Sequence, residues 1–167
     1  MRMSIFAGLV AATAGFVDSF GILGAFIVSI FESFIFPVPT AVFIAPMTAL
    51  GVNPLLLTVI CTIGSVIGAV IGYYLGKHLG NPVAVRLFKQ HRVDKVKKWF
   101  DKWGAWAVFI AAFTPIPFKV FTWCGGIFKI KLKYFILASI AGRFLQFFIA
   151  AYVGNLLGPS FLALLGA

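Results

Sequence analysis

Two stretches decide the fold: IFESFIFPVPT at residues 30–40 and IAAFTPIPFKV at residues 110–120. Each is an apolar run that ends in a Pro-x-Pro pair, and proline interrupts a helix. Each run is therefore broken before it reaches the roughly 20 residues that a transmembrane helix needs. Irregular backbone at membrane depth is tolerated only where it is buried in protein or lines a wet cavity. Both stretches predict re-entrant hairpins, and they mark the place to search for a site.

The composition of the whole chain suits lipid better than water. Of its 167 residues, 62% are hydrophobic and 11% are charged, and the mean hydropathy is +1.06. Soluble domains are about 45–50% apolar and about 25% charged. These values exclude a soluble enzyme, a disordered protein and a disulfide-stapled secreted domain. The two cysteines, Cys61 and Cys124, match no metal or redox spacing, so we expect small buried side chains.

The apolar segments differ in length. Only the runs at 54–76 and 132–154 are unbroken and long enough to span a bilayer. The shorter, proline-punctuated segments lie at about 4–17, 20–36, 41–50, 104–113 and 120–128. The first of them could be a signal peptide, although a retained first helix or signal anchor is the simpler interpretation. We expect one all-α polytopic membrane domain over residues 1–167.

Basic residues are in large excess, with 14 Lys and Arg against 4 Asp and Glu and a formal net charge of +10. Many lie at 81–103, where apolar residues recur at three- and four-residue steps. This pattern predicts a basic amphipathic connector on the membrane surface, with a solvated loop as the alternative. Either way the positive-inside bias places it in the cytoplasm, together with the lysines at 129–133. Membrane lipids with anionic headgroups are the expected partners, and nucleic acid is not.

An internal repeat follows from this topology. With both basic clusters inside, 54–76 runs inward and 132–154 runs outward, so the two halves have opposite orientations. Shifting the chain by 78 residues aligns both Pro-x-Pro pairs and gives eleven identities within fifty positions without a gap. The predicted fold is an inverted repeat of two re-entrant helical hairpins, each followed by a transmembrane helix. Repeat 1 covers about 20–80, and repeat 2 covers about 104–158.

Three charged residues inside apolar segments are the candidate substrate-binding or proton-coupling residues. Glu32 lies in the first hairpin, Lys119 follows the second Pro-x-Pro pair, and Arg143 lies within the last long apolar run. An ion at membrane depth is costly, so such residues mark functional sites by default. The alternatives are that Glu32 snorkels or is a neutral hydrogen-bonded acid, and that Lys119 reaches the cytoplasmic surface. If the hairpin turns meet, the acid and the two cations converge.

Glycines and prolines complete the candidate set. A ridge of glycines at every fourth residue predicts close helix packing; its members are Gly64, Gly68, Gly72, Gly76 and Gly80. The hairpin turns are assigned to Pro37, Pro39, Pro115, Pro117, Gly125 and Gly126. Because the chain has no Ser/His/Asp arrangement, paired carboxylates or phosphate-binding glycine loop, we expect no catalytic residues, no metal, no cofactor and no enzyme activity.

The order of these motifs resembles the DedA family, which shares the VTT or SNARE-associated domain with eukaryotic relatives. The resemblance covers about residues 20–158 and rests on four motifs, namely ESFIFPVP at 32–39, GxxxGYYLG at 68–76, FTPIPFK at 113–119 with the glycines at 125–126, and Gly142-Arg143. It implies a polytopic protein of the bacterial or archaeal inner membrane with two facing re-entrant hairpins. It also matches Glu32 to the family's hairpin acid and Lys119 to the base after its second proline turn.

This chain departs from the family pattern at two positions. Many members have an acid just after the first Pro-x-Pro pair, where this chain has Thr40-Ala41, and an Arg before the second pair, where it has Thr114. These departures indicate a divergent branch.

The resemblance implies lipid translocation, since members are linked to undecaprenyl-phosphate flipping and eukaryotic relatives to phospholipid scrambling. The expected function is therefore transport of a lipid phosphate, either polyprenyl phosphate or phospholipid, across the inner membrane. One alternative is a transporter that couples protons to a small ion or solute. Another is a non-transporting scaffold whose buried charges only fix the helix register.

Overall fold

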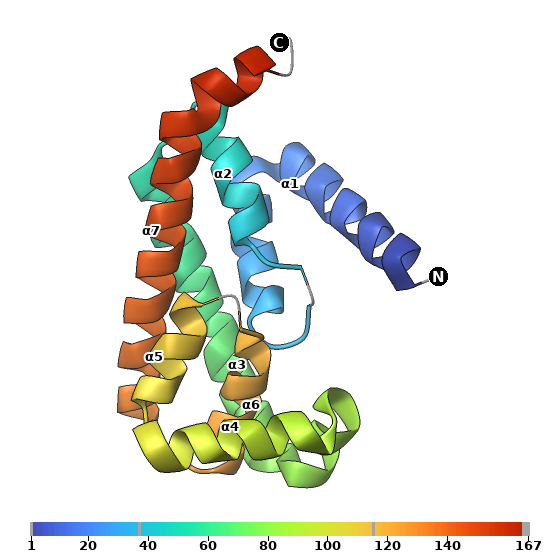
Figure 1. The fold of residues 1–167 in the computed structure, drawn as a ribbon, viewed down its shortest axis with the longest axis vertical. Helices are drawn as coiled ribbons and strands as arrows, with labels where there is room; N and C mark the ends of the chain where they lie inside the picture. The colour runs from blue at the N-terminus through green and yellow to red at the C-terminus, as the bar shows by residue number, and fades with distance from the viewer. Residues whose placement is uncertain (1, 37, 115, 165–167) are drawn as a thin grey trace.

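The computed structural model describes residues 2–36, 38–114 and 116–164, and its regular structure is entirely helical over these ranges. The helices are α1 (Arg2–Glu32), α2 (Ala41–Ala49), α3 (Pro54–Phe88), α4 (Gln90–Trp103), α5 (Trp106–Phe113), α6 (Phe118–Ile127) and α7 (Leu132–Leu164) (Figure 1). The prediction of an all-α protein is confirmed for this part of the chain.

Two helices, α3 and α7, contain segments long and apolar enough to cross a membrane. These segments are Pro54–Phe88 and Leu132–Leu157, and an 18-residue window within each has a mean hydropathy of 2.4 and 1.7, respectively. They include the two unbroken apolar runs of the sequence, so the prediction of two candidate spans is confirmed. The start of α3 is well defined because the Asn53 side chain accepts hydrogen bonds from the first-turn N–H groups. The two helices pack against each other along the molecule.

The shorter apolar segments form two helical hairpins. The first joins α1 to α2 through the turn at 33–40, and the second joins α5 to α6 through the turn at 114–117. With 9 and 10 residues, α2 and α6 are only about 14–15 Å long, half of a hydrocarbon core of about 30 Å. Pro39 and Pro117 lie in these turns, whereas Pro37 and Pro115 lie outside the described residues.

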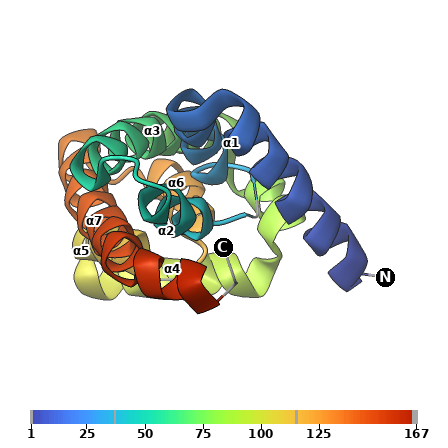
Figure 2. The ribbon, with the colours of Figure 1, turned by 90° about the horizontal axis from the view of Figure 1, so that it is seen from above.

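The second helix of each hairpin packs on the long helix of the other half of the chain, and the first helix packs on the long helix of its own half. The α6 helix packs along α3, and α2 packs along α7, while α1 packs on α3 and α5 on α7. Figure 2 shows α2 and α6 at the centre of the bundle with α3 and α7 outside them. Protein encloses only part of each hairpin: Val38, Thr40 and Phe118 are buried, whereas Ile35 and Val42 are more than half exposed.

Two of the long helices bend at glycines with positive φ angles. The predicted segments 4–17 and 20–36 correspond to two helical pieces of α1, which meet at a kink at Gly21 (φ 55°). The α3 helix kinks at Gly80 (φ 73°) and continues to residue 88. Glycine adopts such angles without the steric penalty of a Cβ atom. Both kinks lie next to a break in hydropathy: Gly21 follows the polar residues at 18–19, and Gly80 lies between the apolar run at 54–76 and the basic connector.

The basic connector at 81–103 contains two helical pieces rather than one helix. Residues 81–88 belong to the end of α3, and α4 begins after Lys89, whose φ of 71° interrupts the helix. The α4 helix crosses one end of the molecule (Figure 1) and buries Val93, Val96 and Phe100. Its apolar side packs on α6 and its neighbours. We expected this apolar side to lie in the membrane interface. It instead packs against the protein core.

The largest buried cluster lies where α4, α5 and α6 meet the start of α7. It includes Tyr73, Phe121, Trp123 and Phe135, each at most 6% exposed. Tyr73 donates a hydrogen bond from its hydroxyl to the Ile130 carbonyl (2.7 Å) and so ties α3 to the α6–α7 connection. Both cysteines are free and buried, as the sequence predicted.

Candidate functional site

Glu32 and Arg143 form an ion pair that joins the two halves of the chain. The Nη2 atom of Arg143 lies 3.0 Å from Oε1 of Glu32, and the side chains are 3% and 12% exposed. Glu32 is the last residue of α1, and Arg143 projects from α7. The structure therefore brings together two of the three charged candidates, at the point where a hairpin turn meets a candidate span.

Thr40 closes the first hairpin turn onto the Glu32 carboxylate. The Thr40 hydroxyl donates a hydrogen bond to Oε2 at 2.7 Å, and its backbone N–H donates to the same oxygen at 3.4 Å. Thr40 is fully buried. Both carboxylate oxygens thus accept hydrogen bonds, one from Thr40 and one from Arg143. The first hairpin turn therefore folds back onto the carboxylate of Glu32.

Arg143 has further partners and one unused donor. Its Nη1 atom donates to Oε1 of Gln146 at 2.9 Å. The guanidinium carbon lies 4.3 Å from the ring centroid of Phe118 and 5.4 Å from that of Phe147, distances typical of cation–π contacts. The Nε–H group is buried without a hydrogen-bond partner in the described chain. Leaving a buried donor unpaired costs about 1–3 kcal/mol, so this atom marks a place where an acceptor would be favourable.

Lys119 lies beside the ion pair rather than in it. Its Nζ atom donates a hydrogen bond to the carbonyl of Ile35 at 3.3 Å. Within the described ranges, the one ion pair is that of Arg143 with Glu32. Glu32 and Arg92 are both close enough to act electrostatically on the Lys119 ammonium. The predicted triad is therefore a buried pair with a third charge next to the hairpin turn.

Side chains of α6 donate hydrogen bonds to the turn that follows α1. The carbonyls at 33–35 accept hydrogen bonds from Thr122 Oγ1 at 3.0 Å, from Trp123 Nε1 at 2.9 Å and from Lys119. These carbonyls belong to the turn that follows α1, so the second hairpin supplies donors to non-helical backbone of the first. The two hairpins are tied together next to Glu32.

The first four glycines of the predicted ridge lie against neighbouring helices, two against α1 and two against α6. A Cβ atom at Gly68 would meet the carbonyl of Ile30, and one at Gly76 would meet the carbonyl of Trp123. Small residues allow this approach of helix backbones. Gly80, the fifth, has no such neighbour and is the kink of α3 instead.

The two glycines assigned to the second hairpin turn lie inside α6. Gly125 and Gly126 are helical and buried, and the turn itself is at 114–117. A Cβ atom at Gly126 would meet the carbonyl of Tyr73, and one at Gly125 would lie 3.0 Å from the Phe135 ring. These glycines bring α6 close to α3 and α7, and they do not form the turn.

Sequence reasoning missed four residues that contact the charged pair: Thr40, Gln146, Phe118 and Phe147. A signal for Gln146 was available, because a residue three positions after Arg143 shares its helix face. Thr40 appeared only as a departure from the family pattern, and its contact with Glu32 depends on the path of the turn. An aromatic residue is too common in this chain for Phe118 to stand out.

Comparison with known proteins identifies the family. The model described as the VTT domain matches residues 36–156, which include α2 to α6 and most of α7. The chain belongs to the VTT-domain (DedA) family. The matched VTT domain contains Lys119 and Arg143, and Glu32 lies just before it. The assignment confirms the resemblance inferred from the sequence motifs.

Similar VTT-domain relatives occur in archaea and bacteria. An uncharacterized protein of Methanocaldococcus jannaschii is 35% identical over 130 residues, which are 78% of this chain and 81% of that protein. An uncharacterized protein of Haemophilus influenzae is 32% identical, over 81% of this chain and 73% of that protein. The Bacillus subtilis membrane protein YbfM is 31% identical, over 42% and 43%. No solved structure matches the chain. The family assignment and the two candidate membrane spans together indicate that this is a membrane protein.

Proposed function

We propose that this VTT-domain protein is a transporter that translocates a lipid phosphate, polyprenyl phosphate or phospholipid, across a bacterial or archaeal inner membrane. The observation that carries the proposal is the buried ion pair of Glu32 and Arg143 between the two halves of the chain. A phosphate presents to an arginine the same fork of oxygens as a carboxylate does. A lipid phosphate can therefore replace Glu32 as the partner of Arg143.

The architecture that we infer for this transporter is an inverted repeat of two re-entrant hairpins. Its support is the pattern of helix packing: α6 lies on α3 as α2 lies on α7, and α1 lies on α3 as α5 lies on α7. If α1, α2 and α3 correspond to α5, α6 and α7, each packed pair in one half has a matching pair in the other. A two-fold axis between the halves would produce this pattern. Transporters of this kind bind their substrates at the interface between the repeats.

The site supplies the charges that a headgroup needs to cross a bilayer. Even the lower estimates put the cost of one ion at the bilayer centre at about 2.5–3.5 kcal/mol. Arg143 offers the phosphate its guanidinium and the unused Nε–H group, while Thr40 keeps the displaced Glu32 hydrogen-bonded. Lys119 adds a second cation beside the turn. No covalent chemistry is required, so the proposal is a transporter and not an enzyme.

The test is transport by the purified protein in liposomes that carry labelled polyprenyl phosphate or labelled phospholipid and enclose a pH-sensitive dye. We expect lipid translocation by the wild type and its loss in Arg143→Ala. Arg86→Ala, which removes an exposed arginine from the end of α3, is the matched control and should transport normally.

The dye and the Glu32→Gln variant separate the alternatives. Lipid scrambling without proton coupling persists in part in Glu32→Gln and leaves the dye unchanged. Proton movement with a solute and without lipid translocation would establish the proton-coupled alternative. A wild-type protein that folds in liposomes and moves neither lipid nor protons would be a scaffold.

A further inference from the structure

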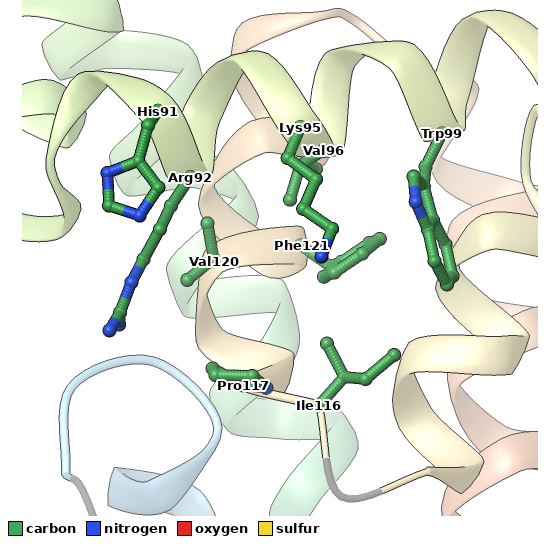
Figure 3. A pocket seen from close by; sticks show the side chains of 9 residues that line it. All are labelled: His91, Arg92, Lys95, Val96, Trp99, Ile116, Pro117, Val120 and Phe121. Carbon is green, nitrogen blue, oxygen red and sulfur yellow. The ribbon is translucent and has the colours of Figure 1, made fainter.

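A second polar feature of the molecule lies outside the Glu32–Arg143 site. A pocket of about 420 Å³ opens between α4 and the start of α6. Figure 3 shows His91, Arg92 and Lys95 extending from α4 into this pocket, with Trp99 at one side. The opposite wall comes from the second hairpin and includes Ile116 and Phe121. We call this the α4–α6 pocket.

The basic edge of the α4–α6 pocket is not neutralised by the protein. In the part of the chain that the structure describes, the ion pair present is that of Arg143, so Arg92 and Lys95 lack an acidic partner. The nearby Asp94 accepts a hydrogen bond from Gln90 instead. Like charges three residues apart disfavour a helix. Helix stability therefore gives no reason to place Arg92 and Lys95 together.

The wall of the pocket is apolar, which argues for a ligand with two chemical parts. Trp99 and Phe121 meet edge to face at 5.8 Å between ring centroids, and Ile116 continues the same surface. A free inorganic anion would use the basic edge and leave this wall empty of contacts. A headgroup that carries an apolar chain would use both.

The place of α4 in the fold supplies the source of such a ligand. The helix crosses one end of the bundle, at the ends of the two candidate spans (Figure 1). A basic helix in that position lies at a membrane surface, where anionic lipids concentrate near Lys and Arg. Ile116 and Pro117 line the pocket, so it adjoins the second hairpin turn.

We propose that the α4–α6 pocket binds one anionic lipid from the leaflet at α4, with its phosphate on Arg92 and Lys95 and the start of its chain on Trp99 and Phe121. This site is distinct from the Glu32–Arg143 pair. It goes beyond the translocation proposed above, because it requires lipid binding and no transport. If translocation occurs, the pocket is where the headgroup first meets the protein.

The test uses the full-length protein in phosphatidylcholine nanodiscs that contain a small fraction of anionic lipid, phosphatidylglycerol, with brominated chains. Bromine quenches indole fluorescence at short range, and the Trp99 signal is the difference between the wild type and Trp99→Phe. We expect stronger quenching of Trp99 by the brominated anionic lipid than by brominated phosphatidylcholine. The variant Arg92→Gln/Lys95→Gln should weaken this preference by about tenfold.

The matched control is Lys97→Gln/Lys98→Gln, which removes two charges from exposed positions of the same helix outside the pocket lining. It should keep the preference, and both double variants should keep the wild-type melting temperature. Equal loss in the two variants would mean diffuse attraction to the surface and would overturn the proposal. Equal quenching by both lipids, or displacement of the lipid by millimolar inorganic phosphate, would also overturn it.

The outcomes separate this site from the proposed function. Lipid preference at Trp99 in a protein that moves no lipid leaves the pocket standing and contradicts the transporter. Lipid translocation without any preference at Trp99 contradicts the pocket and leaves the transporter standing.

Discussion

At the scale of single residues, the pair of Glu32 and Arg143 is a costly structure. Removing two ions from water costs several kcal/mol each, and their attraction offsets this only with good geometry and additional hydrogen bonds. Thr40 and Gln146 provide such bonds, and the Phe118 ring faces the guanidinium. A hydrophobic pair of similar volume would be at least as stable. This balance favours a role for the pair in function rather than in stability.

The pair should show strong coupling in a double-mutant cycle. We expect Arg143→Gln or Glu32→Gln alone to lower the free energy of unfolding by about 3–5 kcal/mol, because each strands a buried charge. The variant with both changes should lose much less than the sum of the two. Reversible unfolding in detergent micelles measures all four proteins. Additive losses would mean that the two side chains do not interact.

The two members of this pair could be found from the sequence, but their pairing could not. A charge within an apolar run is conspicuous because its burial is costly. The two residues are 111 positions apart. The sequence around each of them does not indicate which distant residue it contacts. Lys119 illustrates the limit: it fits the same argument, yet it donates to a backbone carbonyl. Uncharged polar residues such as Thr40 cost little to bury and give no signal.

At the scale of elements, the lengths of the apolar runs predicted the two candidate spans, and the prolines predicted helix interruptions near 33–40 and 114–117. Sequence patterns gave wrong assignments where one residue type can serve two structural purposes. Glycines such as Gly125 and Gly126 can form a turn or permit close helix packing. In the structure both lie in a helix and permit close packing. The break between α3 and α4 falls at Lys89, whose positive φ is rare for a residue with a Cβ atom. Sequence patterns gave no reason to expect it there.

The close contacts of α3 predict the effect of adding one methyl group. Gly68→Ala and Gly76→Ala should each lower the free energy of unfolding by about 1–3 kcal/mol, because the new Cβ would meet a backbone carbonyl of α1 or α6. Helix propensity alone predicts the opposite sign, a gain of about 1 kcal/mol. Gly15→Ala is the matched control, since no atom lies near its Cβ position. It should be neutral or stabilising, and a gain at Gly76 would contradict the packing.

At the scale of the whole molecule, the basic residues gather at one end. The α4 helix and the connection from α6 to α7 lie there, and the turn from α2 to α3 lies at the opposite end (Figure 1). Lys97, Lys131 and Leu50 are exposed reporters of these ends. The positive-inside bias then sets the orientation of the protein in the membrane.

Cysteine labelling in intact cells tests this orientation. In a variant with Cys61 and Cys124 replaced by alanine, Lys97→Cys and Lys131→Cys should react with an impermeant reagent only after the cytoplasmic side is opened. Leu50→Cys should react from outside. Reaction of position 97 in intact cells would reverse the orientation and place the α4–α6 pocket in the outer leaflet.

The account as a whole depends on the exchange of Glu32 for a lipid phosphate at Arg143. The most direct measurement compares translocation of a labelled polyprenyl phosphate with that of the same labelled polyprenol without phosphate, in liposomes that contain the wild type or Glu32→Gln/Arg143→Gln. The double variant removes the cation without stranding a charge, so it should fold. We predict that the wild type moves the phosphate form selectively and that the double variant loses this selectivity. Equal selective transport by both proteins would contradict the account.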